Sequence, residues 1–486
     1  MSNKDTSVQL CKEERLEALL AHLEQLLTDP TQRPRFRQSM LAPMPACLRL
    51  NPLMHQVPDL HRALTARGAQ VPWCPHAFAM PNSEKHLGLS LEYTLGAFYI
   101  QAKATTLAAI ALKPQPGEVV LDMAAAPGGK ATQIAAAMHN TGLLVANEPQ
   151  RKRLPALVGN LERCGVSNAI VTQASGTLLA RYFHNYFDRV LLDAPCSGDG
   201  VLRKDQALLR YWSPEDACRQ AQQQTGLLRA AFHVLKPGGT LVYSTCSLSL
   251  EENEEVLRAL LGRYPDQVDI LPVEEIEPAP LPAALASRYP PQFAHCRRVW
   301  PHLHDTEGAF AAKIRKRGET TWSKIASDAG SWQEPPVTEP THERQYLENH
   351  WQFTLPLAED QILARTGRHL YLQSHKTPAF QTHLPFYVRS GMRVARNHKT
   401  HYYLSQQAAT MWGHTMQKPH LEVTWSQVQE LFQGQPLHLA EPLPFKGELL
   451  CRFGSWTICR GQVQADGREV AGMLPRELQR QELHKF

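Results

Sequence analysis

The sequence predicts an α/β protein built around a doubly wound, mostly parallel sheet. From about residue 116, short apolar runs alternate with helical stretches, a small-residue loop follows the first run, and Lys236-Pro237-Gly238-Gly239 marks a turn before the last. Strands are expected at residues 119–123, 143–146, 169–172, 189–193 and 240–244. Helices are expected near residues 130–138, 151–164 and 214–235, with a further strand at 310–314.

The length of 486 residues predicts more than one domain. Leucines at helical spacing predict a helix over residues 9–27 within a small α+β domain, 1–111, which precedes the sheet domain, 112–317. Residues 318–345 lose periodicity and carry Glu334-Pro335-Pro336, which is typical of a linker. Residues 346–486 are expected to form a β-rich module, with strands at 386–388, 402–404, 449–453 and 456–459.

The formal net charge of +5 permits an anionic partner, and basic residues gather in four places. Interleaved with Tyr402, Tyr403 and Trp412, these clusters favour nucleic acid over a purely solvated face. The clusters are Arg33, Arg35 and Arg37; Arg297 and Arg298; Lys313, Arg315, Lys316 and Arg317; and Arg393, Arg396, His398, Lys399 and His401.

The bulk composition excludes several classes of protein. The ten cysteines form no CxxC pair, so we expect no metal site. No apolar stretch is long enough to span a bilayer, and the first ten residues lack the pattern of a secretory signal. We therefore expect a cytoplasmic protein that does not bind a membrane.

A loop of small residues follows the first predicted strand and lets a ligand approach the backbone closely. It lacks the GxGxxG pattern, which disfavours a dinucleotide site. Glu148 ends the second predicted strand, where an acid can accept hydrogen bonds from ribose hydroxyls. A nucleoside-type cofactor is therefore expected at Ala124, Ala125, Ala126, Pro127, Gly128, Gly129, Lys130 and Glu148.

Two cysteines follow strand ends at the same edge of the predicted sheet. Cys196 comes after Asp193-Ala194-Pro195, and Cys246 lies in Ser244-Thr245-Cys246-Ser247. A thiolate that adds to carbon 6 of cytosine makes carbon 5 nucleophilic, and an acid such as Asp193 can stabilise the charge at N3. A second thiol suits the release step, and Lys130 or a helix N-terminus is expected to lower the pKa of the attacking thiol.

These motifs resemble the NOL1/NOP2/Sun family of RNA cytosine-C5 methyltransferases over about residues 45–317, including Arg49-Leu50-Asn51-Pro52 and Phe98-Tyr99-Ile100-Gln101. The resemblance implies a Rossmann-like methyltransferase sheet, S-adenosyl-L-methionine as cofactor and Cys246 as the nucleophile. It also implies Cys196 as the release cysteine, with the family's motif Lys and Asp at Lys130 and Asp193. Bacterial members of this type imply 16S rRNA as substrate, within the small ribosomal subunit, a monomeric enzyme, and a PUA-like RNA-binding module at the carboxyl terminus.

One position departs from the family pattern. Where an Asp near the adenine is usual, this sequence has Ser175 in Gln173-Ala174-Ser175-Gly176. A serine can hydrogen-bond but brings no charge, which could weaken cofactor binding by roughly 1–3 kcal/mol. Ser175 and Asp193 complete the expected cofactor-binding set.

Three alternatives remain open from the sequence. The substrate could be another RNA, such as tRNA. The order of the thiols could be that of DNA cytosine methyltransferases, in which the Pro-Cys thiol attacks. The chain could also be a non-catalytic RNA-binding ribosome-assembly factor with a decayed cofactor site, and Ser175 is the feature that keeps this reading open.

Overall fold

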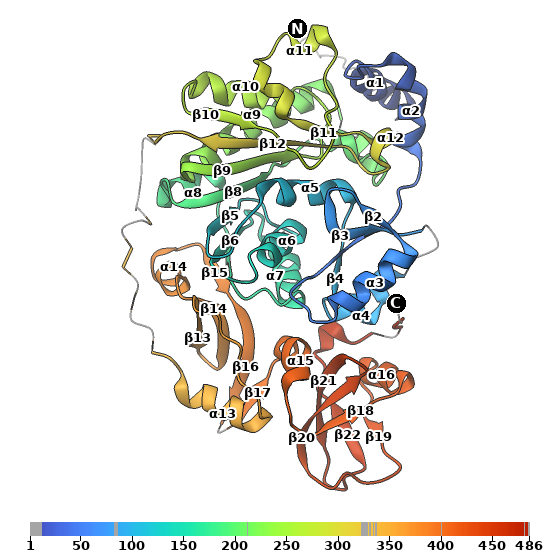
Figure 1. Ribbon diagram of the computed structural model, residues 1–486, viewed down its shortest axis with the longest axis vertical. Coiled ribbons are helices and arrows are strands. Elements are labelled where there is room, and N and C mark those ends of the chain that lie inside the picture. The colour runs from blue at the N-terminus through green and yellow to red at the C-terminus, as the bar shows by residue number, and fades with distance from the viewer. Residues whose placement is uncertain are drawn as a thin grey trace, which may run out of the picture.

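The computed structural model describes residues 12–81, 86–210, 212–321, 329, 332–333, 335, 338–399, 401–480 and 482–484. At the centre of this described part lies a nine-stranded mixed sheet with helices on both faces (Figure 1). The strand order is β10-β12-β9-β8-β5-β6-β7-β15, and β11 pairs with β12. Its strands are β5 (Val119–Asp122), β6 (Leu143–Asn147), β7 (Ala169–Thr172), β8 (Phe187–Asp193), β9 (Leu235–Thr245), β10 (Val268–Leu271), β11 (Arg297–Val299), β12 (Ala309–Lys316) and β15 (Tyr387–Ser390).

The predicted doubly wound α/β sheet is confirmed, with β5 to β9 parallel and β12 antiparallel between β9 and β10. Alternate residues of β5 point to opposite faces, so Val120 packs in one core and Leu121 in the other. One face is covered by α5 (Lys103–Leu112), α6 (Gly129–Ala137) and α7 (Leu154–Arg163). The other is covered by α8 (Gly176–Tyr182), α9 (Pro214–Val234) and α10 (Glu254–Arg263).

The turn predicted at residues 236–239 is wrong, because this segment is the first part of β9. The pairing of β9 with β8 shifts register between Phe187 and Arg189, which marks an irregularity. Gly238 takes a positive φ of 80° there, a conformation open to glycine. The Pro-Gly-Gly signal therefore marks a distortion within a strand instead of a break before it.

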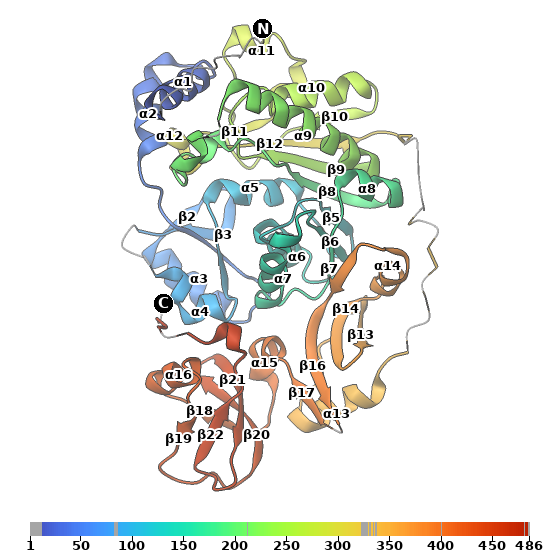
Figure 2. The same cartoon turned by 180° about the vertical axis from the view of Figure 1, so that it is seen from behind.

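Two helices near the amino terminus, α1 (Lys12–Glu24) and α2 (Arg33–Leu41), lie beside the central sheet domain (Figures 1 and 2). The predicted helix over 9–27 is present as α1, while residues 9–11 lie outside the described residues. A separate small sheet follows, in the order β2-β3-β1-β4. Its elements are β1 (Cys47–Leu50), α3 (Val57–Arg67), β2 (Ala69–Val71), β3 (Cys74–Ala79), α4 (Leu91–Thr94) and β4 (Phe98–Ile100).

The carboxyl-terminal region contains two further sheets, ordered β13-β14-β16-β17 and β18-β20-β21-β22-β19. The second sheet shares a hydrophobic core with the β1–β4 unit, and His484 pairs with Ser90. Twelve of the 28 residues of the predicted linker, 318–345, lie outside the described residues, and α13 begins within it at Thr341. The elements are α13 (Thr341–Trp351), β13 (Gln361–Thr366), β14 (His369–Ser374), α14 (Thr377–His383), β16 (Met392–His398), β17 (His401–Leu404), α15 (Gln406–Trp412), β18 (His420–Glu422), α16 (Trp425–Phe432), β19 (Leu437–His438), β20 (Gly447–Phe453), β21 (Trp456–Val463) and β22 (Glu469–Gly472).

One strand of this region, β15, belongs to the central sheet. It pairs antiparallel with β7, and Gly391 donates from its backbone to the carbonyl of Ala169. Both views show β15 and α14 against the β7 edge, in orange beside teal (Figures 1 and 2). The carboxyl-terminal region therefore closes an edge of the central sheet that would otherwise stand open.

Two of the predicted basic clusters contain residues that stabilise the fold instead of facing a ligand. Arg297 and Arg298 are buried, and Arg298 makes a bidentate ion pair with Glu254 at 2.8 and 2.9 Å. Lys316 is fully buried, and its ammonium donates to the carbonyl oxygens of Phe232 and Leu235 at the end of α9. The expectation that these three cations help bind nucleic acid is wrong, because none of them reaches the surface.

No helix in the described part of the chain is long and apolar enough to cross a membrane.

Candidate active site

The two cysteines meet at the carboxyl ends of adjacent parallel strands. Asp193 ends β8 and lies in register with Ser244 of β9, so the segments that follow leave the sheet side by side. The sulfur atoms of Cys196 and Cys246 lie 2.6 Å apart, and the backbone amide of Cys246 donates to Cys196 Sγ at 3.3 Å. Both residues are half-buried and are free cysteines. The structure therefore brings together the two thiols that the sequence singled out.

The two thiols form a hydrogen-bonded pair. The Cys246 sulfur beside it, together with burial, holds the pKa of the Cys196 thiol well above its ordinary value. Glu252 and Asp193 act in the same direction through their negative charge. Cys196 therefore keeps its proton at neutral pH and can donate it in a hydrogen bond to the other sulfur.

Lys130 and Asp193 form an ion pair next to the thiols. The Lys130 ammonium donates to Asp193 Oδ2 at 2.8 Å, and the Ser244 hydroxyl donates to Oδ1 at 2.7 Å. Asp193 raises the pKa of Lys130 against the opposing effect of burial. The pair carries a positive and a negative group to the edge of the sheet at which the two thiols lie.

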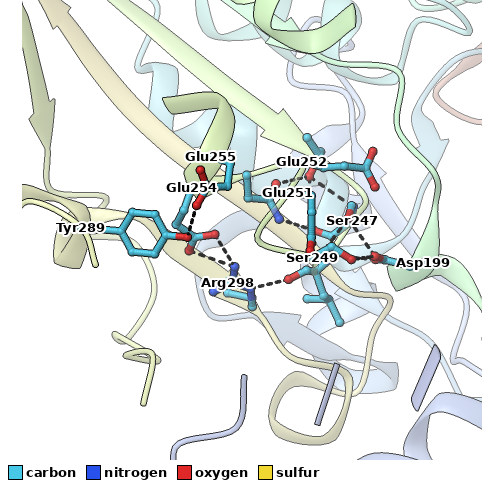
Figure 3. Close-up of polar contacts among 12 residues, drawn as sticks. Asp199, Ser247, Ser249, Glu251, Glu252, Glu254, Glu255, Tyr289 and Arg298 are labelled. Carbon is cyan, nitrogen blue, oxygen red and sulfur yellow. Dashed lines mark hydrogen bonds and ion pairs between the residues drawn. The ribbon is translucent and has the colours of Figure 1, made fainter. Parts of the chain in front are cut away.

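Two buried carboxylates hold the two cysteine loops together in a reciprocal arrangement. Asp199, on the Cys196 loop, accepts from the Ser247 hydroxyl at 2.9 Å and the Leu248 amide at 2.6 Å, and also from the Ser249 hydroxyl. Figure 3 shows these contacts converging on Asp199 from the Cys246 loop. Each donor lies at least 48 residues away in the sequence, so the contact joins two separate loops.

Glu252, on the Cys246 loop, makes the opposite connection. It accepts from the backbone amide of Ser197 at 2.9 Å and from the Ser197 hydroxyl, and the Gln224 amide donates to it at 2.8 Å. Sequence reasoning missed both acids, although each lies within six residues of a cysteine motif. The crossed contacts fix the thiols relative to one another.

The amino-terminal helices support the same loops. Leucines of α1 and the Phe36 and Met40 side chains of α2 share a hydrophobic core with Leu202 and Leu248, which follow Cys196 and Cys246 in the chain. Arg37 is held by ion pairs to Glu17 and Glu24, so this member of a predicted basic cluster joins α1 to α2. These helices therefore form part of the scaffold of the candidate site.

The small-residue loop connects β5 to α6 and lies over the end of β6. The Ala125 amide donates to the Asn147 carbonyl at 2.7 Å, and Gly128 takes a positive φ of 112° just before α6. A side chain at Gly128 would be strained and would approach Asn160. The loop contains Ala124, Ala125, Ala126, Pro127, Gly128 and Gly129, as predicted for a close approach to a ligand.

The acids around this loop have atoms available for a polar ligand. Glu148 is fully buried; its Oε1 accepts from the Gln150 amide at 2.8 Å, while Oε2 lies 3.3 Å from Arg153 Nη1 in an ion pair and accepts no aligned hydrogen bond. Asp122 is also fully buried, neither of its oxygens is hydrogen-bonded, and burial raises its pKa to about 7. Unsatisfied buried acceptors beside a glycine-containing cradle fit the ribose and ammonium groups of S-adenosylmethionine.

Asn147 is a residue that sequence reasoning missed. Its side-chain amide donates to the carbonyls of Met123 and Ala174, both at 2.9 Å, and its oxygen accepts from the Ala174 amide at 3.0 Å. It thus joins three strand ends around the cofactor loop. Ser175 lies next to this network, is exposed, and caps α8 by accepting from the Leu178 amide at 3.2 Å.

A small cavity of about 50 Å³ lies beside the catalytic candidates. Lys130, Asp193 and Cys246 line it together with Glu307, which precedes β12. Glu307 is 2% exposed, and its Oε2 has no hydrogen-bond partner. Glu307 could not be predicted from the sequence, because no pattern in the chain links residue 307 to residues 193 and 246.

Residues 109–315 match the family model described as 16S rRNA methyltransferase RsmB/F, and residues 17–103 match the N-terminal domain of 16S rRNA methyltransferase RsmF. Over 471 residues the chain is 33% identical to ribosomal RNA small subunit methyltransferase F of Aeromonas salmonicida, covering 95% of this chain and 96% of that protein. The protein of the same name from Vibrio cholerae is 33% identical over 475 residues, covering 96% and 97%.

Solved structures agree with this assignment. A methyltransferase homolog protein from Pyrococcus horikoshii superposes with a TM-score of 0.55 at 34% identity, covering 64% of this chain and all of that one. NSun6 from Pyrococcus horikoshii with SFG has the same fold, with a TM-score of 0.53 at 22% identity over 62% of this chain and 98% of that one. The family resemblance and the cofactor predicted from the sequence are confirmed, and the chain belongs to the RsmB/F family of S-adenosylmethionine-dependent 16S rRNA methyltransferases.

Proposed function

We propose that the chain methylates carbon 5 of one cytosine in 16S rRNA through a covalent intermediate with Cys246. The observation that carries the proposal is the contact of 2.6 Å between the sulfurs of Cys196 and Cys246, next to the Lys130–Asp193 ion pair. A single thiol would suffice for many cysteine enzymes. A second thiol in contact with the first suits a reaction in which the first must also be expelled.

The attack step uses Cys246 and the ion pair. The Cys246 sulfur adds to carbon 6 of the base, and the Lys130–Asp193 pair passes a proton to N3, which neutralises the negative charge that develops at N3 and O2. S-adenosylmethionine supplies the methyl group, which carbon 5 of the resulting adduct attacks. The cofactor would be held by residues 124–130, by Glu148, and by Asp193 and Ser175 at its two ends.

The release step uses Cys196. A base, for which solvent water suffices, takes the proton from carbon 5. The electrons of that C–H bond restore the double bond between carbons 5 and 6, and the bond to Cys246 breaks to leave the Cys246 thiolate. Cys196 is a neutral thiol in contact with Cys246 Sγ, because its pKa is raised, so it can donate a hydrogen bond to the departing thiolate. The family resemblance of the Thr-Cys-Ser motif supports Cys246 as the attacking residue over the order used by DNA cytosine methyltransferases.

The substrate is proposed to be 16S rRNA presented by the small ribosomal subunit to a monomeric enzyme that needs no metal. A cavity of about 1170 Å³ lies between α7, the β1–β4 unit and the carboxyl-terminal sheets. Its size supports binding of a large anion. Its lining includes basic and aromatic side chains from the fourth predicted cluster and beyond: Arg393, Arg396, His398, Tyr403 and Arg480. We propose that the carboxyl-terminal region binds RNA, with its last sheet as the PUA-like module.

The test uses small subunits and free 16S rRNA from a strain that lacks the gene. Purified protein and labelled S-adenosylmethionine should introduce 5-methylcytosine at one position, which bisulfite sequencing locates. Cys246→Ala should abolish the product, whereas the matched control Cys218→Ala, at an exposed cysteine of α9, should not. Absence of 5-methylcytosine from both substrates would overturn the proposal.

The order of the two thiols has its own test. An oligonucleotide with 5-fluorocytosine at the target position traps the covalent adduct, since the proton at carbon 5 has been replaced. An adduct that survives Cys196→Ala and disappears in Cys246→Ala supports the proposed order. The opposite result would assign the attack to Cys196. Micromolar binding of S-adenosylmethionine by calorimetry would exclude a non-catalytic assembly factor with a decayed site.

A further inference from the structure

The small cavity beside Cys246 has a polar wall. It lies between α5 and the ends of β9 and β12, and its volume of about 50 Å³ would hold a few water molecules or the polar edge of a pyrimidine. Lys130, Asp193, Ser244 and Glu307 contribute the polar groups. Three of these four already pair with one another, because Asp193 accepts from both Lys130 and Ser244. Glu307 is the member outside that network.

Glu307 has the features of a group that awaits a ligand. It is 2% exposed, yet Oε2 has no hydrogen-bond partner. Burial raises the pKa of this carboxyl, the charges of Lys204 and Lys130 oppose that change, and Asp193 adds to it. Its oxygens are acceptors in the ionised form, and the carbonyl oxygen remains an acceptor in the protonated form. A buried acceptor without a donor destabilises the protein unless a bound molecule supplies one.

The backbone around Glu307 is fixed relative to the thiols. The Gly308 amide donates to the Gly200 carbonyl at 2.7 Å, and the Gly200 amide donates to the Cys246 carbonyl at 3.0 Å. A Cβ on Gly200 would lie 2.6 Å from the Cys246 carbonyl oxygen and 2.7 Å from that of Gly308, so the three backbone segments are in direct contact. On the other side, Arg203 donates to the Thr306 carbonyl at 3.2 Å. Glu307 therefore lies at a defined position beside the attacking residue.

We infer that Glu307 accepts a hydrogen bond from the exocyclic amino group of the target cytosine and so determines specificity for cytosine over uracil. This inference rests on the proposed function. Cytosine presents acceptors at O2 and N3 and a donor at the amino group, whereas uracil presents a donor at N3 and an acceptor at O4. The Lys130–Asp193 pair interacts with O2 and N3 of cytosine. Glu307 supplies the acceptor that the amino group needs, which uracil cannot use.

A chemical double-mutant cycle tests the inference with the full-length protein. Two RNAs carry either cytidine or 2-pyrimidinone ribonucleoside, which lacks the amino group, at the mapped position, and the rate of adduct formation with Cys246 is measured. Glu307→Leu should slow the reaction of cytidine about 10- to 100-fold, the value of one hydrogen bond to a charged group. It should change the rate with pyrimidinone less than about 3-fold, since the bond does not exist there. Glu274→Leu, at an exposed acid, is the control.

The outcomes separate the inference from the proposed function. Equal slowing on both RNAs would show that Glu307 only supports the fold and would overturn the inference. No adduct between wild-type protein and cytidine RNA would overturn the proposed function itself. Glu307→Gln gives an independent measurement, because its amide can donate to O4 of uracil. The ratio of kcat/KM for cytidine over uridine should fall about 10-fold, and an unchanged ratio would contradict the inference.

Discussion

Replacing Asp199 by alanine should loosen the contact between the two cysteine loops. Asp199 accepts hydrogen bonds from the Leu248 amide and from the hydroxyls of Ser247 and Ser249, and it is 2% exposed. Without Asp199 the Leu248 amide has no acceptor and cannot turn to a new one, which costs about 1–3 kcal/mol. The two serine hydroxyls can rotate to other acceptors, so the loss of their hydrogen bonds adds only about 1 kcal/mol in total. The expected loss of local stability is about 2–4 kcal/mol.

Hydrogen exchange measured by mass spectrometry checks this value at the loop itself, which matters because a chain with several domains need not unfold in one step. A loss of 2–4 kcal/mol predicts that peptides containing Leu248 exchange about 30 to 900 times faster. Adduct formation should slow as well, since the two sulfurs lose their fixed distance. The control is Asp205→Ala, which removes an exposed carboxylate that accepts from one backbone amide at Ala207. Unchanged exchange at Leu248 in folded Asp199→Ala would show that Asp199 does not hold the two cysteine loops together.

Three further predictions concern other acids, the cofactor and the release step. Cys196→Ala should accumulate covalent protein–RNA complexes on denaturing gels, because the attack by Cys246 proceeds and release is impaired. Ser175→Asp should keep the cap of α8 and tighten S-adenosylmethionine binding about 10- to 100-fold by calorimetry, since it adds a charged acceptor. The folded pKa of Asp122, about 7, lies above the unfolded value, so rising pH through this window destabilises the protein. Asp122→Asn should therefore gain up to about 4 kcal/mol over wild type between pH 4 and 8, measured by hydrogen exchange of peptides from β5 after correction for the intrinsic rate at each pH, and a difference that is independent of pH would contradict this.

The sequence was sufficient for the sheet and for the convergence of the thiols, for a physical reason. Parallel strands bring their carboxyl ends to one edge, so Asp193 and Ser244, recognised as the ends of two apolar runs, had to lie near each other. The contact of the sulfurs at 2.6 Å did not follow, because it depends on the paths of two irregular loops. Those paths are set by Asp199 and Glu252, whose partners lie about 50 residues away.

Charge patterns along the chain were a poorer guide than apolar patterns. Arg298 and Lys316 occur in basic runs that suggest a surface, yet both are buried because each meets acceptors from distant segments, Glu254 in one case and the end of α9 in the other. The pairing of β15 with β7 was equally hidden, since Tyr387–Ser390 follows that strand by more than 200 residues. Contacts of this kind depend on the assembled fold and leave no local signal.

The hydrogen-bond partners of the acids around the thiols separate two kinds of role. Asp199 and Glu252 are fully engaged with loop amides and hydroxyls, so they have little capacity left for a ligand and act on the geometry of the site. Asp122 and Glu307 are buried with unpaired oxygens, which lowers the free energy of unfolding by more than packing around them offsets. The unpaired acids lie on the cofactor side and on the base side of the same sheet edge. A ligand that supplies donors to both would remove this cost, and S-adenosylmethionine together with a cytosine supplies one donor group for each.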